Sequence, residues 1–256
     1  MSTKWLLKPF LMGISRAFPA PTRKKDQPWL KLWPWRKKLG PLWSWEQTPN
    51  SDRVGLAVPN GARGFVLLNG NETAALLADH VLSKWQESGK LNRPSFVAKT
   101  VVTTNLLIDI ANDYGVDVKE TLTGFKFIAE AIRQEEGKSQ YVVGGEESYG
   151  YLVGDEVRDK DAVQSCCLLA ELAHDLHERG EGMLDRLADL HRRHGAYKEG
   201  LMSVVKEGRE GRAQIEAMML KFRSAPPMEL AGERVIEILD FLSLIHISEP
   251  TRHERI

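Results

Sequence analysis

The side chains best suited to binding or catalysis lie in one loop, between residues 144 and 163. Glu146, Glu147 and Ser148 stand together near its start, and Lys160 stands near its end. Carboxylates and a hydroxyl form hydrogen bonds with sugar hydroxyls, and a lysine attracts an anion. The pattern therefore indicates a site for a polyhydroxylated, anionic ligand, although a solvated connection between a strand and a helix is also rich in charge.

Two further loops have residues that suit such a site. In the segment 48–53, Thr48, Asn50 and Asp52 alternate, so an extended backbone directs all three toward one point. This spacing suits Mg²⁺, but a hard cation prefers carboxylates and only Asp52 is one. The segment 120–126 opens a helix, where backbone N–H groups favour anions.

Strands and helices alternate along the chain and place these loops at strand ends. The predicted strands are 53–58, 65–68, 96–102, 116–118, 140–143 and 235–238. The first predicted helix has its N-cap at Asn71 and ends at Gly89. The other predicted helices are 106–114, 125–134, 160–179, 183–194 and 208–223. This order predicts a layered α/β domain with ligand loops at the carboxyl ends of its strands.

The formal net charge of zero conceals two oppositely charged parts. Residues 1–48 contain ten Lys/Arg, two acids and six of the seven tryptophans, so the remainder carries about −8. An acidic body does not suggest a nucleic-acid partner. By themselves, residues 1–48 have the composition of a cationic membrane-surface segment or, less well, of a targeting peptide.

Two observations bear on the compartment. Cys166 and Cys167 are adjacent in a helical pattern, where neighbours rarely form a disulfide, so a reducing, cytoplasmic environment is favoured. No apolar run has the length needed to span a membrane, so no membrane partner is expected. The sequence shows no sign of an obligate protein partner.

Five ordered motifs lie between residues 49 and 242. They are Asp-Arg-Val-Gly (52–55), Leu-Leu-Asn-Gly-Asn (67–71), Thr-Leu-Thr-Gly (121–124), Gly-Glu-Glu-Ser-Tyr-Gly (145–150) and Arg-Asp-Lys-Asp-Ala-Val (158–163). Together they resemble the α-D-phosphohexomutase family, specifically its phosphoglucomutase type. Members have four domains, so the resemblance implies a layered α/β/α third domain with a mixed sheet, plus part of a second α/β domain.

The resemblance also implies roles for individual residues. The implied substrate-binding residues are Glu146, Ser148, Thr123, Gly124, Lys160, Arg53 and Lys126. The implied Mg²⁺ loop consists of Asp52, Asn50 and Thr48. We expect Glu147, Asp155 and Glu156 to be solvated or bonded to backbone, and Asp159 and Asp161 to begin a helix. The histidines lie in helical patterns without a ligand constellation.

The chain departs from the family pattern in its metal loop, where the family has acids at the positions of Thr48 and Asn50. Translation of residues 1–48 in a shifted frame would explain this, because every tryptophan codon then becomes a Leu, Met or Val codon. With suitable codons, the shifted frame can give family-like strings and an Asp at position 48, so we hypothesise a frameshift. Residues 242–256 resemble a translated sequencing adapter.

These observations divide the chain into five segments. They are a frame-shifted remnant of domain two (1–48), the end of domain two with the start of domain three (49–90), domain three (91–223), a linker toward domain four (224–241) and an adapter-derived tail (242–256). The family's phosphoserine loop and distal phosphate loop have no counterpart in the 256 residues.

The resemblance implies a fragment of a Mg²⁺-dependent phosphoglucomutase. The whole enzyme would interconvert glucose 1-phosphate and glucose 6-phosphate through a phosphoserine and a bisphosphorylated sugar. We expect this chain to be inactive alone. The alternatives are a phosphomannomutase or phosphopentomutase fragment, a non-catalytic domain that binds sugar phosphates, and a membrane-binding segment at residues 1–48.

Overall fold

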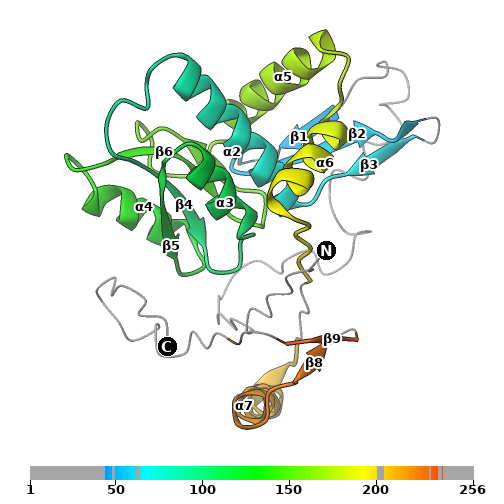
Figure 1. The fold of residues 1–256 in the computed structure, drawn as a ribbon. Coiled ribbons are helices and arrows are strands. Elements are labelled where there is room, and N and C mark those ends of the chain that lie inside the picture. The colour runs from blue at the N-terminus through cyan, green and yellow to red at the C-terminus, as the bar shows by residue number, and fades with distance from the viewer. Residues whose placement is uncertain are drawn as a thin grey trace. The chain divides into compact units, whose positions relative to one another are not determined.

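The computed structural model describes residues 44–47, 50–61, 64–200, 205–230, 232–235 and 238. The chain forms two compact units, one of residues 18–197 and one of residues 1–17 with 198–256. The first unit contains every predicted ligand loop (Figure 1). Residues 1–43 and 241–256, and with them most of the proposed frame-shifted segment and all of the proposed tail, lie outside the described residues.

A four-stranded sheet carries the ligand loops. Its order is β5-β4-β6-β7, with β4 at Ser95–Thr100, β5 at Asp117–Thr121, β6 at Gln140–Gly145 and β7 at Tyr151–Val153. Strand β4 pairs in parallel with β5 and β6, and β7 runs antiparallel to β6. The predicted mixed sheet is confirmed, but the prediction of a continuous loop after residue 143 is wrong because β6 extends to Gly145 and β7 returns beside it.

Alternation of side chains along β4 gives the sheet two buried faces. Phe96 and Ala98 pack with α4 (Phe125–Gln134) on one face. Val97 joins the larger cluster on the other face, which includes α2 (Gly70–Glu87) and α3 (Leu106–Asp113). Because helices cover both faces, the domain has the predicted α/β/α layers.

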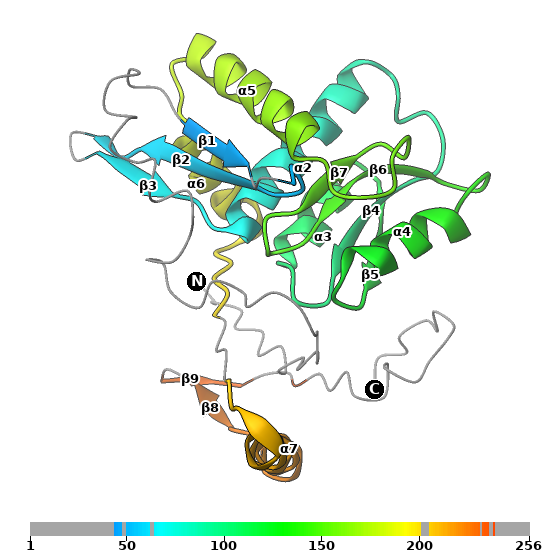
Figure 2. The same ribbon diagram turned by 180° about the vertical axis from the view of Figure 1, so that it is seen from behind.

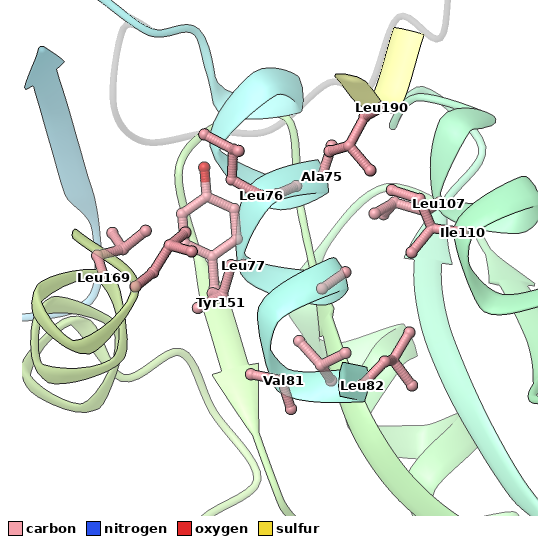
Figure 3. Close-up of a cluster of buried hydrophobic side chains, with 14 of the residues drawn as sticks. Ala75, Leu76, Leu77, Val81, Leu82, Leu107, Ile110, Tyr151, Leu169 and Leu190 are labelled. Carbon is pink, nitrogen blue, oxygen red and sulfur yellow. The ribbon is translucent and has the colours of Figure 1, made fainter. Parts of the chain in front are cut away.

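Helix α2 is the centre of the larger cluster. Figure 3 shows its leucines between α3, β7, α5 (Ala162–Glu178) and α6 (Met183–His194). The predicted N-cap at Asn71 is wrong. Asn69 caps the helix, since its side chain accepts from Glu72 N–H at 2.9 Å and Glu72 accepts from Asn69 N–H at 2.7 Å. Asn71 lies inside the helix, and its side chain accepts from Thr104 N–H at 3.0 Å.

A smaller antiparallel sheet precedes α2. Its order is β1-β2-β3, formed by Ser44–Gln47, Val54–Pro59 and Phe65–Leu67. Helix α5 contacts β1 and β2, so this sheet and the larger domain meet in one unit (Figure 2). Whether this sheet belongs to a partial second domain, as the resemblance implies, stays a prediction.

The second unit contains α7 (Gly208–Ser224), β8 (Glu229–Leu230) and β9 (Glu233–Arg234). The predicted strand at 235–238 is wrong at its start, because β9 ends at Arg234 and Val235 is not in a strand. No helix of the described part of the chain has the length and apolar character needed to cross a membrane. The segment boundaries derived from the motifs remain predictions.

Candidate functional site

Glu146 lies directly after β6 and joins two of the predicted ligand loops. It begins a tight turn in which Glu146 N–H donates to Gly150 O at 2.9 Å and Tyr149 N–H donates to Glu146 O at 3.2 Å. Its carboxylate oxygen Oε1 accepts from Gly124 N–H at 3.1 Å. The second oxygen, Oε2, has no hydrogen-bond partner among the described residues, so it remains able to accept from a ligand hydroxyl.

The Glu146 carboxylate is nearly enclosed, with 5% of the residue exposed. Burial, reinforced by the charge of Glu147, raises the pKa of Glu146, and Lys160, Arg53 and the Gly124 N–H offset part of this effect. Oε2 is not among the buried atoms that lack a partner, so it keeps contact with solvent and can be reached by a ligand.

Two glycines allow the loops to approach one another. Gly124 adopts a φ of 119°, which a residue with a side chain rarely adopts, immediately before α4. At Gly150 a Cβ atom would lie 2.4 Å from Lys160 Cδ, so a larger residue would displace that lysine side chain from its position. Thr123 is exposed beside Gly124. The predicted Gly124 is therefore positioned at the site, and Gly150 joins it as a residue that the sequence analysis did not select.

Lys160 bridges the turn and the segment that begins β2. Its Nζ lies 3.0 Å from Asp159 Oδ1 and 3.7 Å from Asp52 Oδ2. The same ammonium group lies 5.3 Å from the centre of the Phe125 ring. The side chain is 15% exposed, so the charge is partly desolvated yet still reachable from solvent.

The segment 51–54 docks against the same turn. Arg53 Nη1 donates to Ser148 O at 3.2 Å, and Val54 N–H donates to Tyr149 O at 3.1 Å. These bonds use the backbone of Ser148, and its hydroxyl has no hydrogen-bond partner among the described residues. Arg53, Ser148 and Glu146 therefore meet at one place, as the resemblance implies.

Lys126 lies at the periphery. Its side chain is exposed, with Nζ 4.8 Å from the Phe127 ring centre. It shares with Lys160 an open pocket of about 500 Å³ beside α4. The pocket is lined by Phe125, Lys126, Ala129, Glu130, Arg133, Arg158, Asp159 and Lys160. Lys126 is thus near the site, but within the part of the chain that the structure describes it forms no hydrogen bond or ion pair with Glu146 or Ser148.

The predicted metal loop does not fit Mg²⁺. Asn50 is exposed, Thr48 lies outside the described residues, and Asp52 is the one carboxylate of the segment. That carboxylate faces the ammonium group of Lys160. Within the described ranges, no group of three or more His, Cys, Asp or Glu side chains is arranged to hold a metal ion. A hard cation requires more negative oxygen ligands than this segment supplies.

The remaining acids of the loop divide into two groups. Asp155 and Glu156 are exposed, and Asp161 caps α5 by accepting from Gln164 N–H at 2.9 Å, all as predicted. Asp159 is exposed and bonds to Lys160. The prediction for Glu147 is wrong, because its side chain is only partly exposed and its Oε2 lies 3.4 Å from the hydroxyl oxygens of two buried threonines.

Lys99 is a buried charge that the sequence analysis missed. Its residue is 0% exposed, and its Nζ lies 2.5 Å from Glu120 Oε2. The same Nζ donates to the carbonyl oxygens of Thr100 and Thr103 at 3.1 and 3.2 Å. A lysine at the end of an otherwise apolar strand is the signal that could have identified it, because a buried ammonium group requires several acceptors.

Comparisons with known proteins show which family the chain resembles. Residues 69–193 match the phosphoglucomutase/phosphomannomutase α/β/α domain III. The chain is 38% identical over 193 residues to a phosphoglucomutase of Staphylococcus epidermidis and 37% identical over 205 residues to one of Staphylococcus aureus. These alignments cover 75% and 79% of this chain but 35% and 36% of the relatives. The chain therefore spans about a third of the length of the curated relatives it matches.

A solved structure shows the same fold. A Thermus thermophilus protein described as a phosphomannomutase superimposes with a TM-score of 0.51 at 22% identity, over 68% of this chain and 35% of that chain. Its similarity supports the layered arrangement of strands and helices, and the sequence relatives add the family. The chain thus belongs to the α-D-phosphohexomutase family and carries its α/β/α domain III.

Proposed function

We propose that this chain carries the sugar-recognition site of a phosphoglucomutase. The observation that carries the proposal is a pair of polar atoms on one tight turn, Glu146 Oε2 and the Ser148 hydroxyl, for which the described residues provide no hydrogen-bond partner. A carboxylate accepts from adjacent sugar hydroxyls, and a serine both donates and accepts. Arg53 and Lys160 beside the turn supply positive charge for the phosphate of a hexose phosphate.

The proposed reaction of the whole protein interconverts glucose 1-phosphate and glucose 6-phosphate through a phosphoserine and a bisphosphorylated sugar. In such phosphoryl transfer the protein contributes mainly positioning and charge neutralisation. Within this chain the turn at Glu146 would hold the sugar ring, and Gly124 would hold Glu146. Thr123 and Lys126 lie at the margin of the same site.

We do not propose that Mg²⁺ binds this chain, since the segment 50–53 lacks the ligands. For the whole protein we propose a Mg²⁺ loop with acids at positions 48 and 50, as the shifted reading frame would restore. Consequently we expect no mutase turnover from the 256-residue chain. The free state of Cys166 and Cys167 is compatible with a cytoplasmic location, which is part of the proposal.

Binding of glucose 1-phosphate to the chain, measured by calorimetry and by NMR, tests the proposal. We expect weak binding that Glu146→Ala reduces by about 100-fold or to an undetectable level, because one carboxylate carries several charge-assisted hydrogen bonds. Glu156→Ala, which removes an exposed carboxylate from the same loop, is the matched control and should bind normally. Equal binding by both variants would contradict the assignment.

A phosphomannomutase is the second candidate, since the matching domain family includes both enzyme types. The same titration with mannose 1-phosphate separates the two. A preference for the glucose epimer supports the first proposal, and the reverse preference supports the second. Binding of both sugars without preference would favour a sugar-phosphate-binding domain whose selectivity arises elsewhere.

A further inference from the structure

Glu147 lies between the two residues assigned to sugar recognition, but its side chain points into the domain. Its Oε2 lies 3.4 Å from the hydroxyl oxygens of both Thr100 and Thr103, so it can accept from one of them at a time. The two threonine hydroxyls lie 2.8 Å from one another, and both residues are 0% exposed. Glu147 therefore connects the turn after β6 to the turn after β4.

The number of available protons shows that Glu147 serves here as a hydrogen-bond acceptor. Thr100 and Thr103 have one hydroxyl proton each, and one of these protons occupies the bond between the two hydroxyls. Among the described residues, the other proton can reach Glu147 Oε2 or Gly145 O, which lies 3.4 Å from Thr103 Oγ1. Both of these acceptors belong to the strand and turn that carry Glu146, so either arrangement ties the turn to the threonines.

The threonine turn is itself rigid. Lys99 Nζ donates to the carbonyl oxygens of Thr100 and Thr103, and the same ammonium group pairs with Glu120 just before the Thr123–Gly124 loop. The anchor of Glu147 is therefore shared with the loop that donates Gly124 N–H to Glu146. The position of Glu146 depends on both connections.

The backbone of the turn needs such an anchor. Tyr149 adopts a φ of 74°, which is strained for a residue with a side chain and persists only where the surroundings hold it. On the other side of the turn, the backbone oxygen of Glu147 packs so closely against α2 that a Cβ atom at Gly70 would lie 1.9 Å from it. The turn is thus held between α2 and the threonines.

We propose that Glu147 is a positioning residue, whose acceptor oxygen fixes the turn on which Glu146 and Ser148 meet the sugar. This inference rests on the proposed function of the site. A general stabilising role would depend on the charge or the volume of the Glu147 side chain. The proposed positioning role depends on its acceptor oxygen.

The test compares Glu147→Gln with Glu147→Leu in the 256-residue chain. Glutamine keeps a carbonyl acceptor, and leucine keeps similar volume without one. The first readout is hydrogen exchange of the Gly124 amide in the free protein, because that amide donates to Glu146. The second is the affinity for glucose 1-phosphate, and the melting temperature is recorded alongside both.

We expect Glu147→Leu to accelerate Gly124 exchange and to weaken the sugar phosphate affinity, each by about tenfold. We expect Glu147→Gln to remain within about twofold of the unaltered chain in both. Glu156→Leu, at an exposed position of the same loop, is the control and should change neither. Thr100→Val removes one hydroxyl from the anchor and provides a second variant if Glu147→Leu does not fold; it should shift both readouts in the same direction.

Normal Gly124 exchange in Glu147→Leu, or an equal loss in Glu147→Gln and Glu147→Leu, would overturn the proposal. A uniform acceleration at all amides would assign Glu147 to general stability and would overturn it too. If the unaltered chain does not bind glucose 1-phosphate, the proposed function fails, while the exchange of Gly124 in the free protein still decides the role of Glu147.

Discussion

The turn Glu146–Gly150 and the segment Asn50–Arg53 lie at the same site but are built differently. The turn is held by backbone bonds, by Gly124 and by a buried anchor beneath Glu147. The segment is held by the Arg53 side chain, which donates to Ser148 O, and by Ser51 O, which accepts from Ala162 N–H, and it lacks the carboxylates that its proposed role requires. The two regions meet at Lys160, which lies close to Asp52 and packs over Gly150.

This difference shows that the two functions depend on different physical requirements. Sugar recognition requires a few acceptors and donors in a fixed geometry, which a folded loop supplies through many neutral bonds. Metal binding requires a concentration of negative charge, which no arrangement of the remaining residues can replace. Domain III can therefore be structurally complete while the metal segment beside it is chemically incomplete.

The largest expected effect comes from Gly70→Ala, which tests the packing beneath the sugar turn. An added Cβ atom would lie 1.9 Å from Glu147 O, so either α2 or the turn must move. We expect a loss of about 1–3 kcal/mol in the free energy of unfolding, measured by urea denaturation. The Tyr151 hydroxyl, which donates to Gly70 O at 2.9 Å, should lose this bond.

Gln86→Ala is the control for Gly70→Ala, because it changes an exposed residue of the same helix. It should leave stability within about 0.5 kcal/mol of the original. If Gly70→Ala leaves the stability unchanged, the turn is not confined by α2. The turn Glu146–Gly150 would then not be more firmly held than the segment Asn50–Arg53.

A smaller effect is expected from Thr48→Asp combined with Asn50→Asp, which supplies the charge that the metal segment lacks. We expect Mn²⁺ affinity, followed by electron paramagnetic resonance, to rise by about tenfold or more, because the number of carboxylates governs binding of hard cations. Reversal by Asp52→Asn in the same background is the control. If Mn²⁺ affinity does not rise, missing charge is not the reason that this segment fails as a metal site.

The smallest expected effect is the pH dependence that Glu146 contributes. Since burial raises its folded pKa, the folded state binds a proton more readily than the unfolded state does. Its stabilising contribution to the free energy of unfolding is therefore greatest below the pKa of the unfolded state, about 4.3. This contribution falls as the pH rises through the higher pKa of the folded state. Sugar phosphate binding should follow the opposite direction, because the ionised carboxylate is the better acceptor of two hydroxyls.

The difference between the unaltered chain and Glu146→Gln isolates these two trends, since the ligand phosphate titrates equally in both. We expect a change in affinity of no more than about tenfold across this window. The measurements are chemical denaturation and calorimetric binding at several pH values. Parallel trends in stability and affinity, in place of opposite ones, would show that Glu146 does not accept from the sugar.

Much of the fold followed from local patterns in the sequence. The helix at residues 125–134 and most other elements lie where the apolar spacing predicts them, because periodicity reports directly on which face is buried. The errors have local causes: a competing N-cap residue in one case and a very short strand in the other. Asn71 has the residue type of an N-cap, but Asn69 forms the reciprocal bonds with Glu72. Strand β7 is short and follows a tight turn, so its pattern is too brief to detect.

The sequence alone determined the family, the order of the layers and the chemical types at the site, including the deficiency of acids at positions 48 and 50. Those conclusions depend on residue types and their spacing, which are read directly from the sequence. Only the tertiary structure decided that Glu146 is enclosed and bound to Gly124, that Lys160 lies between Asp52 and Gly150, and that Glu147 faces inward. The sequence shows a glutamate in a loop but not whether its carboxylate is solvated or bonded to a buried hydroxyl. Contacts between segments that are distant in the sequence decide between these two environments.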